Sequence, residues 1–178
     1  MHLGPLQKAR LHYRPLVASM LRNLSKVRLK PLSAEKEAHS SVKYLFPKTS
    51  HQVSCRLVQE EREACSALKV GVFFSGGQAA GGHNVIAGLF DALKQINSHS
   101  ELIGFLEGPI GVLENRRKIL GEDAISPYRN QGGFDLIGSG RLKIETKEQF
   151  AKALQNTRDL DGIVVVGGDD SNTNAALM

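Results

Sequence analysis

Residues 69–75 read Lys-Val-Gly-Val-Phe-Phe-Ser, an apolar run rich in β-branched and aromatic side chains that ends at Gly76 and Gly77. A short apolar run that stops at glycines predicts a strand buried on both faces of a parallel sheet. Apolar residues then recur at helical spacing over residues 83–97. Strand, glycine turn and helix in this order are the repeating unit of α/β proteins. We therefore expect a Rossmann-like parallel sheet with flanking helices over residues 68–178.

The same alternation continues towards the C-terminus. The expected elements are a strand at 102–106, a brief helix at 111–120, a short strand at 134–137, a helix that begins at the capping box of 146–149, and a strand at 161–168. Another helix is expected to begin directly after the last strand, with Ser171 as a candidate N-cap.

The N-terminal third differs in composition from the rest of the chain. Residues 1–67 contain 12 Lys and Arg against 5 Asp and Glu, whereas residues 68–178 contain 11 against 13, and 17 of the 18 glycines fall at or after Gly71. Leu16, Met20 and Leu24 recur at helical spacing, and residues 33–39 are typical of a capped helix. We expect a mostly helical, basic arm over residues 1–67.

This arm carries no visible catalytic chemistry. On composition alone its basic start could be a mitochondrial transit peptide or a nucleic-acid-binding arm. We expect a structural or interface element instead, and nucleic-acid binding is disfavoured because no aromatic ladder accompanies the basic residues. No run of eighteen apolar residues occurs, so the sequence predicts no membrane span. Cys55 and Cys65 are too few for a disulfide scaffold and lack the spacing of a zinc site, which favours a cytoplasmic protein.

Two glycine turns, at 76–82 and 167–168, follow predicted parallel strands. In an open α/β sheet, ligands bind beyond the carboxyl ends of the strands. Glycine lets backbone amides approach an anion, and the next helix adds partial positive charge, so both turns are candidate phosphate sites. The alternative is tight strand-to-helix packing without a ligand. Neither Gly-Lys-Ser/Thr nor a G-x-G-x-x-G after a strand is present, which argues against Walker ATPases and dinucleotide-binding proteins.

Charged residues near these turns suggest what the ligand is. Asp169 and Asp170 would repel a phosphate unless a cation lay between them, and Mg²⁺ takes one or two carboxylates together with phosphate oxygens. The alternative is that both are solvated acids at a helix start. Arg129 and Arg141 lie among glycines and are candidate anion ligands. His83 is expected to be structural, and residues 116–118 are expected to form a solvated basic helix face.

Four segments together resemble the phosphofructokinase family, in its long pyrophosphate-dependent branch. They are Ser75-Gly-Gly-Gln-Ala-Ala-Gly-Gly-His-Asn84, Pro127-Tyr-Arg-Asn-Gln-Gly-Gly-Phe-Asp135, Gly138-Ser-Gly-Arg141 and Gly167-Gly-Asp-Asp-Ser-Asn-Thr-Asn-Ala175. The resemblance covers residues 68–178 closely and the basic arm loosely. It implies an incomplete phosphofructokinase fold and Mg-dependent, reversible phosphoryl transfer from pyrophosphate to fructose 6-phosphate in glycolysis. It also implies a homo- or hetero-oligomer without nucleic-acid or membrane partners.

The resemblance also implies roles for single residues. It implies that the phosphoryl donor binds at Gly76, Gly77 and Arg141, that Ser171 and Asn172 contact substrate, and that Asp169 holds the Mg²⁺. Asp170 stands where ATP-using relatives have glycine, so its carboxylate would repel the α-phosphate of a nucleotide and favour pyrophosphate. One departure is Ala80, where the family usually has proline.

A larger departure concerns the acceptor side of the site. The Thr-Ile-Asp motif that carries the family's general base does not occur in residues 1–178. We therefore expect the chain to be the N-terminal part of a longer enzyme and to be inactive alone. Two alternatives are a non-catalytic regulatory or truncated subunit of the same fold, and another kinase with a Gly-Gly-Asp turn, such as a lipid or NAD kinase.

Overall fold

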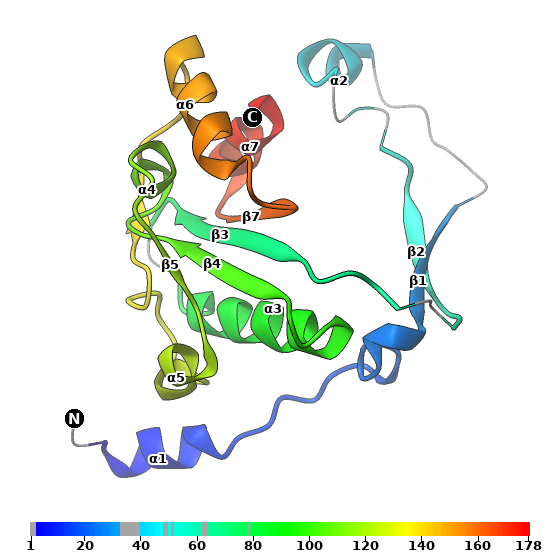
Figure 1. The fold of residues 1–178 in the computed structure, drawn as a ribbon, viewed down its shortest axis with the longest axis vertical. Helices are drawn as coiled ribbons and strands as arrows, with labels where there is room; N and C mark the ends of the chain where they lie inside the picture. The colour runs from blue at the N-terminus through cyan, green and yellow to red at the C-terminus, as the bar shows by residue number, and fades with distance from the viewer. Residues whose placement is uncertain (1–2, 33–39, 48–49, 51, 62–63, 78) are drawn as a thin grey trace.

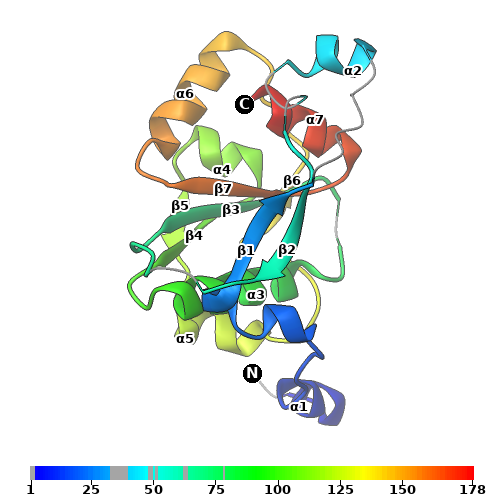
Figure 2. The ribbon, with the colours of Figure 1, turned by 90° about the vertical axis from the view of Figure 1, so that its right-hand side faces the viewer.

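The structure is a computed structural model, and it describes residues 3–32, 40–47, 50, 52–61, 64–77 and 79–178. Residues 69–178 form an α/β sheet with helices on both faces, as the sequence predicts (Figure 1). The described residues before 69 form an arm that runs beside this sheet (Figure 2).

The sheet is organised around β3 (Lys69–Ser75), which is its central strand. β4 (Glu101–Phe105) and β7 (Gly162–Val166) pair parallel with its two opposite edges. The two-residue strand β6 (Ser139–Gly140) pairs parallel with Phe74 and Ser75, beyond β4. β5 (Arg117–Ile119) pairs antiparallel with β4. The parallel strands therefore end on the same side of the sheet, where the glycine turns begin.

Helices cover both faces of this sheet. α3 (Gly82–Ile96) and α5 (Glu122–Ile125) lie on one face, and α4 (Pro109–Leu113), α6 (Lys147–Thr157) and α7 (Asp169–Leu177) lie on the other (Figure 1). The longest of the helices described, α3, has 15 residues, and none in the described part of the chain qualifies as a membrane span.

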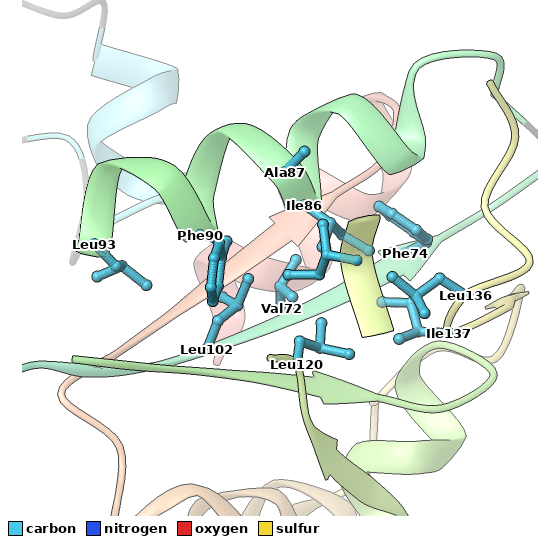
Figure 3. Close-up of a cluster of buried hydrophobic side chains, with 11 residues drawn as sticks. Val72, Phe74, Ile86, Ala87, Phe90, Leu93, Leu102, Leu120, Leu136 and Ile137 are labelled. Atoms are coloured by element: carbon cyan, nitrogen blue, oxygen red, sulfur yellow. The ribbon is translucent and has the colours of Figure 1, made fainter. Parts of the chain in front are cut away.

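Side chains of β3 alternate between two hydrophobic clusters, as expected for a strand buried on both faces. Val72 and Phe74 pack beneath α3 against Ile86 (Figure 3). Phe73 points to the other face, where it packs in the cluster that contains Ile144. This alternation confirms the prediction of a doubly covered central strand.

The expected capping box is present at the start of α6. The Thr146 hydroxyl accepts a hydrogen bond from the Gln149 amide, and the Gln149 side chain accepts one from the Thr146 amide. Two other expectations are wrong. The helix expected at 111–120 ends at Leu113, because Asn115 adopts a positive φ of 54° and β5 then pairs with β4. The strand expected at 134–137 is a turn, and the short pairing with β3 occurs at β6 instead.

The arm contains a two-stranded sheet that the sequence pattern did not predict. β1 (Val27–Pro31) pairs antiparallel with β2 (Cys55–Gln59). The described helices of the arm are short: α1 (Pro5–Leu11), α2 (Ser40–Leu45) and the 3₁₀ turns Ser19–Leu21 and Leu24–Lys26. The helix expected from the spacing of Leu16, Met20 and Leu24 is not formed. Two 3₁₀ turns and then β1 occupy residues 19–31 instead. The helix expected at 33–39 lies outside the described residues.

Candidate functional site

A cavity of about 530 Å³ lies at the carboxyl ends of β3 and β7. The two glycine turns, the start of α7 and the segment after β6 all contribute to its wall. The lining residues are Phe74, Ser75, Gly76, Gly77, Ala79, Gly82, Phe134, Arg141, Lys143, Val166, Gly167, Gly168, Asp169, Asp170, Ser171 and Asn174. Most of the sequence-predicted site residues are therefore brought together in one cavity.

The first glycine turn is fixed by its backbone. Gly76 has a φ of +109°, a conformation that side chains other than glycine rarely adopt. Its amide donates a hydrogen bond to the Gly140 carbonyl over 2.8 Å, and its carbonyl accepts one from the Ser139 hydroxyl over 2.9 Å. The Gly76 amide is therefore engaged within the protein, and this turn is tied to the segment that leads to Arg141.

The second glycine turn brings the start of α7 against the end of β3. The Ser171 hydroxyl lies 2.9 Å from the Ser75 hydroxyl and 3.2 Å from the Ser75 carbonyl oxygen. A Cβ on Gly167 would lie 2.5 Å from that carbonyl oxygen and also clash with Ser171. Only glycine fits at 167. Gly168 is the N-cap of α7. The prediction of Ser171 as N-cap is wrong, because the helix begins at Asp169, three residues earlier than an N-cap at Ser171 would allow.

The two acids lie in the first turn of α7. Both carboxylates are exposed, and Asp169 Oδ1 accepts a hydrogen bond from the Asp170 amide over 3.0 Å. Within the described residues, no three acidic, His or Cys side chains gather into a group that could hold a metal. Mg²⁺ commonly takes only one or two protein carboxylates and completes its shell with phosphate and water oxygens. This pair of hard oxygen ligands therefore fits a Mg²⁺ that arrives with a phosphate.

Two cations face the acids and the first glycine turn. Arg141 extends over Gly77, where a built Cβ would lie 3.2 Å from its Nη2 atom. Lys143 Nζ lies 3.6 Å from Asp170 Oδ2. Lys143 was missed in the sequence, although residues 141 and 143 of an extended segment lie on the same side of the chain. The cavity thus contains acids on one wall and cations on the other.

Asn174 also lines the cavity and was missed in the sequence. Its side-chain oxygen accepts a hydrogen bond from the Ile144 amide over 3.1 Å, and its NH₂ group donates one to the Ile144 carbonyl. The helix that carries the acids is therefore bonded to the segment that carries the cations.

Asn172 lies on α7, exposed and outside the set of residues that line the cavity. Its substrate contact stays a prediction. Arg129, expected to bind an anion, instead forms ion pairs with Asp91 and Glu122 over 2.7 and 3.0 Å. The hydrogen bond to Asp91 raises the pKa of the Arg129 guanidinium, so its charge is used within the protein.

His83 has the structural role expected for it. The side chain is buried, and its Nε2 accepts a hydrogen bond from the Leu136 amide over 3.1 Å. Its ring lies 4.6 Å from the Tyr128 ring. Burial lowers the pKa of His83, although the Gly132 carbonyl and the negative charge of Asp135 oppose this shift. A neutral imidazole that accepts a backbone hydrogen bond is consistent with a structural residue.

The basic residues 116–118 do not form a helix face. Arg116 pairs with Glu107 and Glu114, and Arg117 pairs with Asp159 over 2.8 Å. The hydrogen bond from Arg117 holds the pKa of Asp159 well below its usual range, and one from Lys69 adds to the effect. The charges of Arg116 and Arg117 are therefore paired with acids, and neither residue lines the cavity.

The fold and the cavity together define a class: an α/β protein of Rossmann-like architecture with a charged cavity at the carboxyl ends of its parallel strands. Residues 69–178 match the model of one family, described as Phosphofructokinase. The chain belongs to the phosphofructokinase family. Among solved structures it is similar to phosphofructokinase from Pichia pastoris in the T-state. That likeness has a TM-score of 0.51 at 24% identity, covers 66% of this chain and 13% of the other, and concerns the fold alone.

Curated relatives extend the similarity into the arm. The chain is 46% identical to pyrophosphate–fructose 6-phosphate 1-phosphotransferase of Treponema pallidum, over all of this chain and 34% of that protein. It is 45% identical to subunit beta 1 of the enzyme of the same name from Arabidopsis thaliana, over 97% of this chain and 31% of the relative. The chain thus spans about a third of the length of these relatives.

Proposed function

We propose that this chain forms the pyrophosphate and Mg²⁺ site of a phosphotransferase that transfers a phosphoryl group from pyrophosphate to fructose 6-phosphate. The products are fructose 1,6-bisphosphate and phosphate, and the reaction is reversible. One observation carries the proposal: Asp169 and Asp170 share a cavity with Arg141 and Lys143 beside two glycine turns. The names of the two curated relatives supply the substrates.

Phosphoryl transfer depends mainly on positioning and on charge neutralisation. Arg141 and Lys143 would hold the phosphate oxygens of the donor from one wall of the cavity. The amino end of α7 contributes partial positive charge from the opposite wall. Asp169 would hold the Mg²⁺, which when bound neutralises charge on the transferred phosphoryl group. The protein's own contribution is therefore a rigid frame of fixed charges.

Donor choice is assigned to Asp170. Its carboxylate is exposed, at the cavity wall and beside Lys143, so it would repel the additional phosphate that a nucleotide presents there. Pyrophosphate lacks the nucleoside and its α-phosphate. A negative charge at this position therefore selects the smaller donor.

The name of one relative also supports a proposal about assembly. A relative named as a beta subunit belongs to an enzyme with more than one kind of chain. We therefore propose that the active protein is a homo- or hetero-oligomer, working in cytoplasmic glycolysis without nucleic-acid or membrane partners.

The proposal is tested first by binding. Titration of the 178-residue chain with pyrophosphate and Mg²⁺, followed by ³¹P NMR, should detect weak, Mg-dependent binding, and Asp169→Asn should abolish the Mg dependence. Turnover is tested in a hybrid, in which this chain replaces the aligned third of the Treponema pallidum relative. We expect the hybrid to form fructose 1,6-bisphosphate with pyrophosphate and not with ATP. A folded hybrid without pyrophosphate-dependent turnover would favour the non-catalytic subunit.

The role of Asp170 is tested in the same hybrid. Asp170→Gly should lower kcat/KM for pyrophosphate at least about tenfold, equal to about 1.4 kcal/mol of transition-state stabilisation, and should raise ATP use. Glu148→Gly is a matched control, because Glu148 occupies the same helical position in the first turn of α6, outside the cavity. An unchanged donor preference in Asp170→Gly would contradict the assignment.

A further inference from the structure

The wall of acids and the wall of cations belong to different segments of the chain. The acids lie in the first turn of α7, and the cations lie in residues 141–143, which have no regular secondary structure. Irregular segments move more than helices do. A site that works by charge placement needs something that fixes the distance between these two segments.

Within the described residues, two sets of polar contacts join α7 to residues 143 and 144. One is the ion pair of Lys143 with Asp170, at 3.6 Å and with both side chains exposed. Exposed pairs of this kind contribute little and are screened by salt. The other is a pair of hydrogen bonds, in which the Ile144 amide donates to the Asn174 side-chain oxygen and the Asn174 NH₂ group donates to the Ile144 carbonyl. The half-buried Asn174 is therefore the stronger link.

Ile144 is well suited to receive this link. Its side chain is fully buried in the hydrophobic cluster that contains Phe73 and Phe105. The Ile144 backbone is thus held by the core on one side and by Asn174 on the other. It lies one residue from Lys143 and three residues from Arg141, so fixing Ile144 limits how far both cations can move from the acids.

We propose that Asn174 is a positioning residue for the phosphoryl donor, which holds Arg141 and Lys143 at a fixed distance from Asp169 through the backbone of Ile144. The proposal rests on the proposed function. It assigns to Asn174 no contact with the reacting atoms. Its amide is suited to the task because it can donate and accept at once, and so it satisfies both backbone groups of one residue.

The test compares Asn174→Ala with Asn156→Ala. Alanine keeps α7 helical, since it has the best helix propensity. Asn156 is a matched control, because its side-chain NH₂ group donates to the Val112 and Leu113 carbonyls, over 2.9 and 3.0 Å, away from the cavity. Each variant loses a side-chain amide that forms two hydrogen bonds to the backbone, here called the clamp. Only the loss of the Asn174 clamp should affect the donor site. If Asn174→Ala does not fold, Asn174→Ser takes its place.

One measurement reports on the hydrogen bonds between Asn174 and Ile144, and a second reports on donor binding. Amide hydrogen exchange on the 178-residue chain should be at least tenfold faster at Ile144 in Asn174→Ala and unchanged there in Asn156→Ala. In the hybrid enzyme, Asn174→Ala should raise the KM for pyrophosphate about tenfold, with a smaller change in kcat and in the KM for fructose 6-phosphate.

Each outcome decides a separate point. Faster exchange together with an unchanged KM for pyrophosphate would show that the clamp is structural only, and would overturn the proposal. Unchanged exchange at Ile144 would overturn the clamp itself. A folded wild-type hybrid that does not use pyrophosphate would refute the proposed function, and with it the positioning role, while hydrogen exchange would still report on the clamp.

Discussion

Gly167→Ala should destabilise the protein and displace α7. A Cβ at this position would lie 2.5 Å from the Ser75 carbonyl oxygen and 2.5 Å from the Ser171 Cβ. Neither atom is the end of a flexible side chain. The new methyl group can therefore be accommodated only if α7 moves away from β3, which separates the two serines.

The size of the effect follows from these contacts. Loss of the hydrogen bond between Ser171 and Ser75 costs about 1 kcal/mol. Forcing an additional methyl group into a packed junction costs about 1 to 3 kcal/mol. Together they predict a loss of about 2 to 4 kcal/mol, which corresponds to about 5 to 15 °C in Tm for a chain of this size. The shift of α7 should also weaken Mg-dependent pyrophosphate binding.

Gly168→Ala is the matched control, because a Cβ there has no neighbouring heavy atom within 4 Å and the φ of −85° suits any residue. We expect it to cost less than about 1 kcal/mol, from the weaker N-cap propensity of alanine. Thermal unfolding followed by circular dichroism measures both variants. Equal Tm values for the two variants would refute the steric argument.

Three further predictions concern other parts of the structure. Asp169→Asn in the hybrid should lower Mg-dependent kcat/KM at least about a hundredfold, and it should leave Tm nearly unchanged because the side chain is exposed. Assays across Mg²⁺ concentrations and a melting curve check this prediction, and normal turnover would contradict it. Burial lowers the pKa of His83 below 6.5, so the unfolded state binds a proton at this residue more readily than the folded state. The contribution of neutral His83 to the free energy of unfolding should therefore be complete above pH 6.5 and should be lost as the pH falls below it. Tm should therefore fall more between pH 7.5 and 5.5 in the wild type than in His83→Gln, and parallel losses would count against this reasoning. Asn130→Gly removes the hydrogen bonds to the carbonyls of Arg10 and Tyr13, so it should speed tryptic cleavage after Arg10. Gln95→Ala removes a hydrogen bond to the Arg22 carbonyl and should not change that rate, and equal rates in the two variants would argue against the role of Asn130.

The central α/β unit could be predicted because its signals are local. A buried strand, an amphipathic helix and a capping box each show in a few consecutive residues, as in residues 69–75 and 146–149. The errors occur where pairing decides the structure. β5 forms because residues 117–119 meet the edge of β4, and β1 forms because residues 27–31 meet β2 from almost thirty residues away. Strand formation depends on such neighbours more than on intrinsic propensity.

The candidate site shows the same division. The glycine turns and the acids could be placed because they directly follow predicted strands, and the ends of parallel strands share one edge of a sheet. The sequence could not show which of the candidate arginines lies at the site. Arg129 and Arg141 both lie among glycines, and what separates them is the position of Asp91 and Glu122, which pair with Arg129. Those partners lie 38 and 7 residues away in the sequence and come together only in the fold.

The polar character of α7 explains why its two main contacts were not predicted. A helix that covers a sheet usually presents an apolar stripe, whereas residues 169–174 read Asp-Asp-Ser-Asn-Thr-Asn. Ser171 and Asn174 are three residues apart and so lie on one face, and each forms hydrogen bonds with a different segment. Hydrogen bonds depend more strongly on distance and angle than apolar contacts do. Hydrogen bonds therefore fix the position of the start of α7 more closely than apolar packing would. A site whose charged side chains must stand at set distances requires such a fixed helix start.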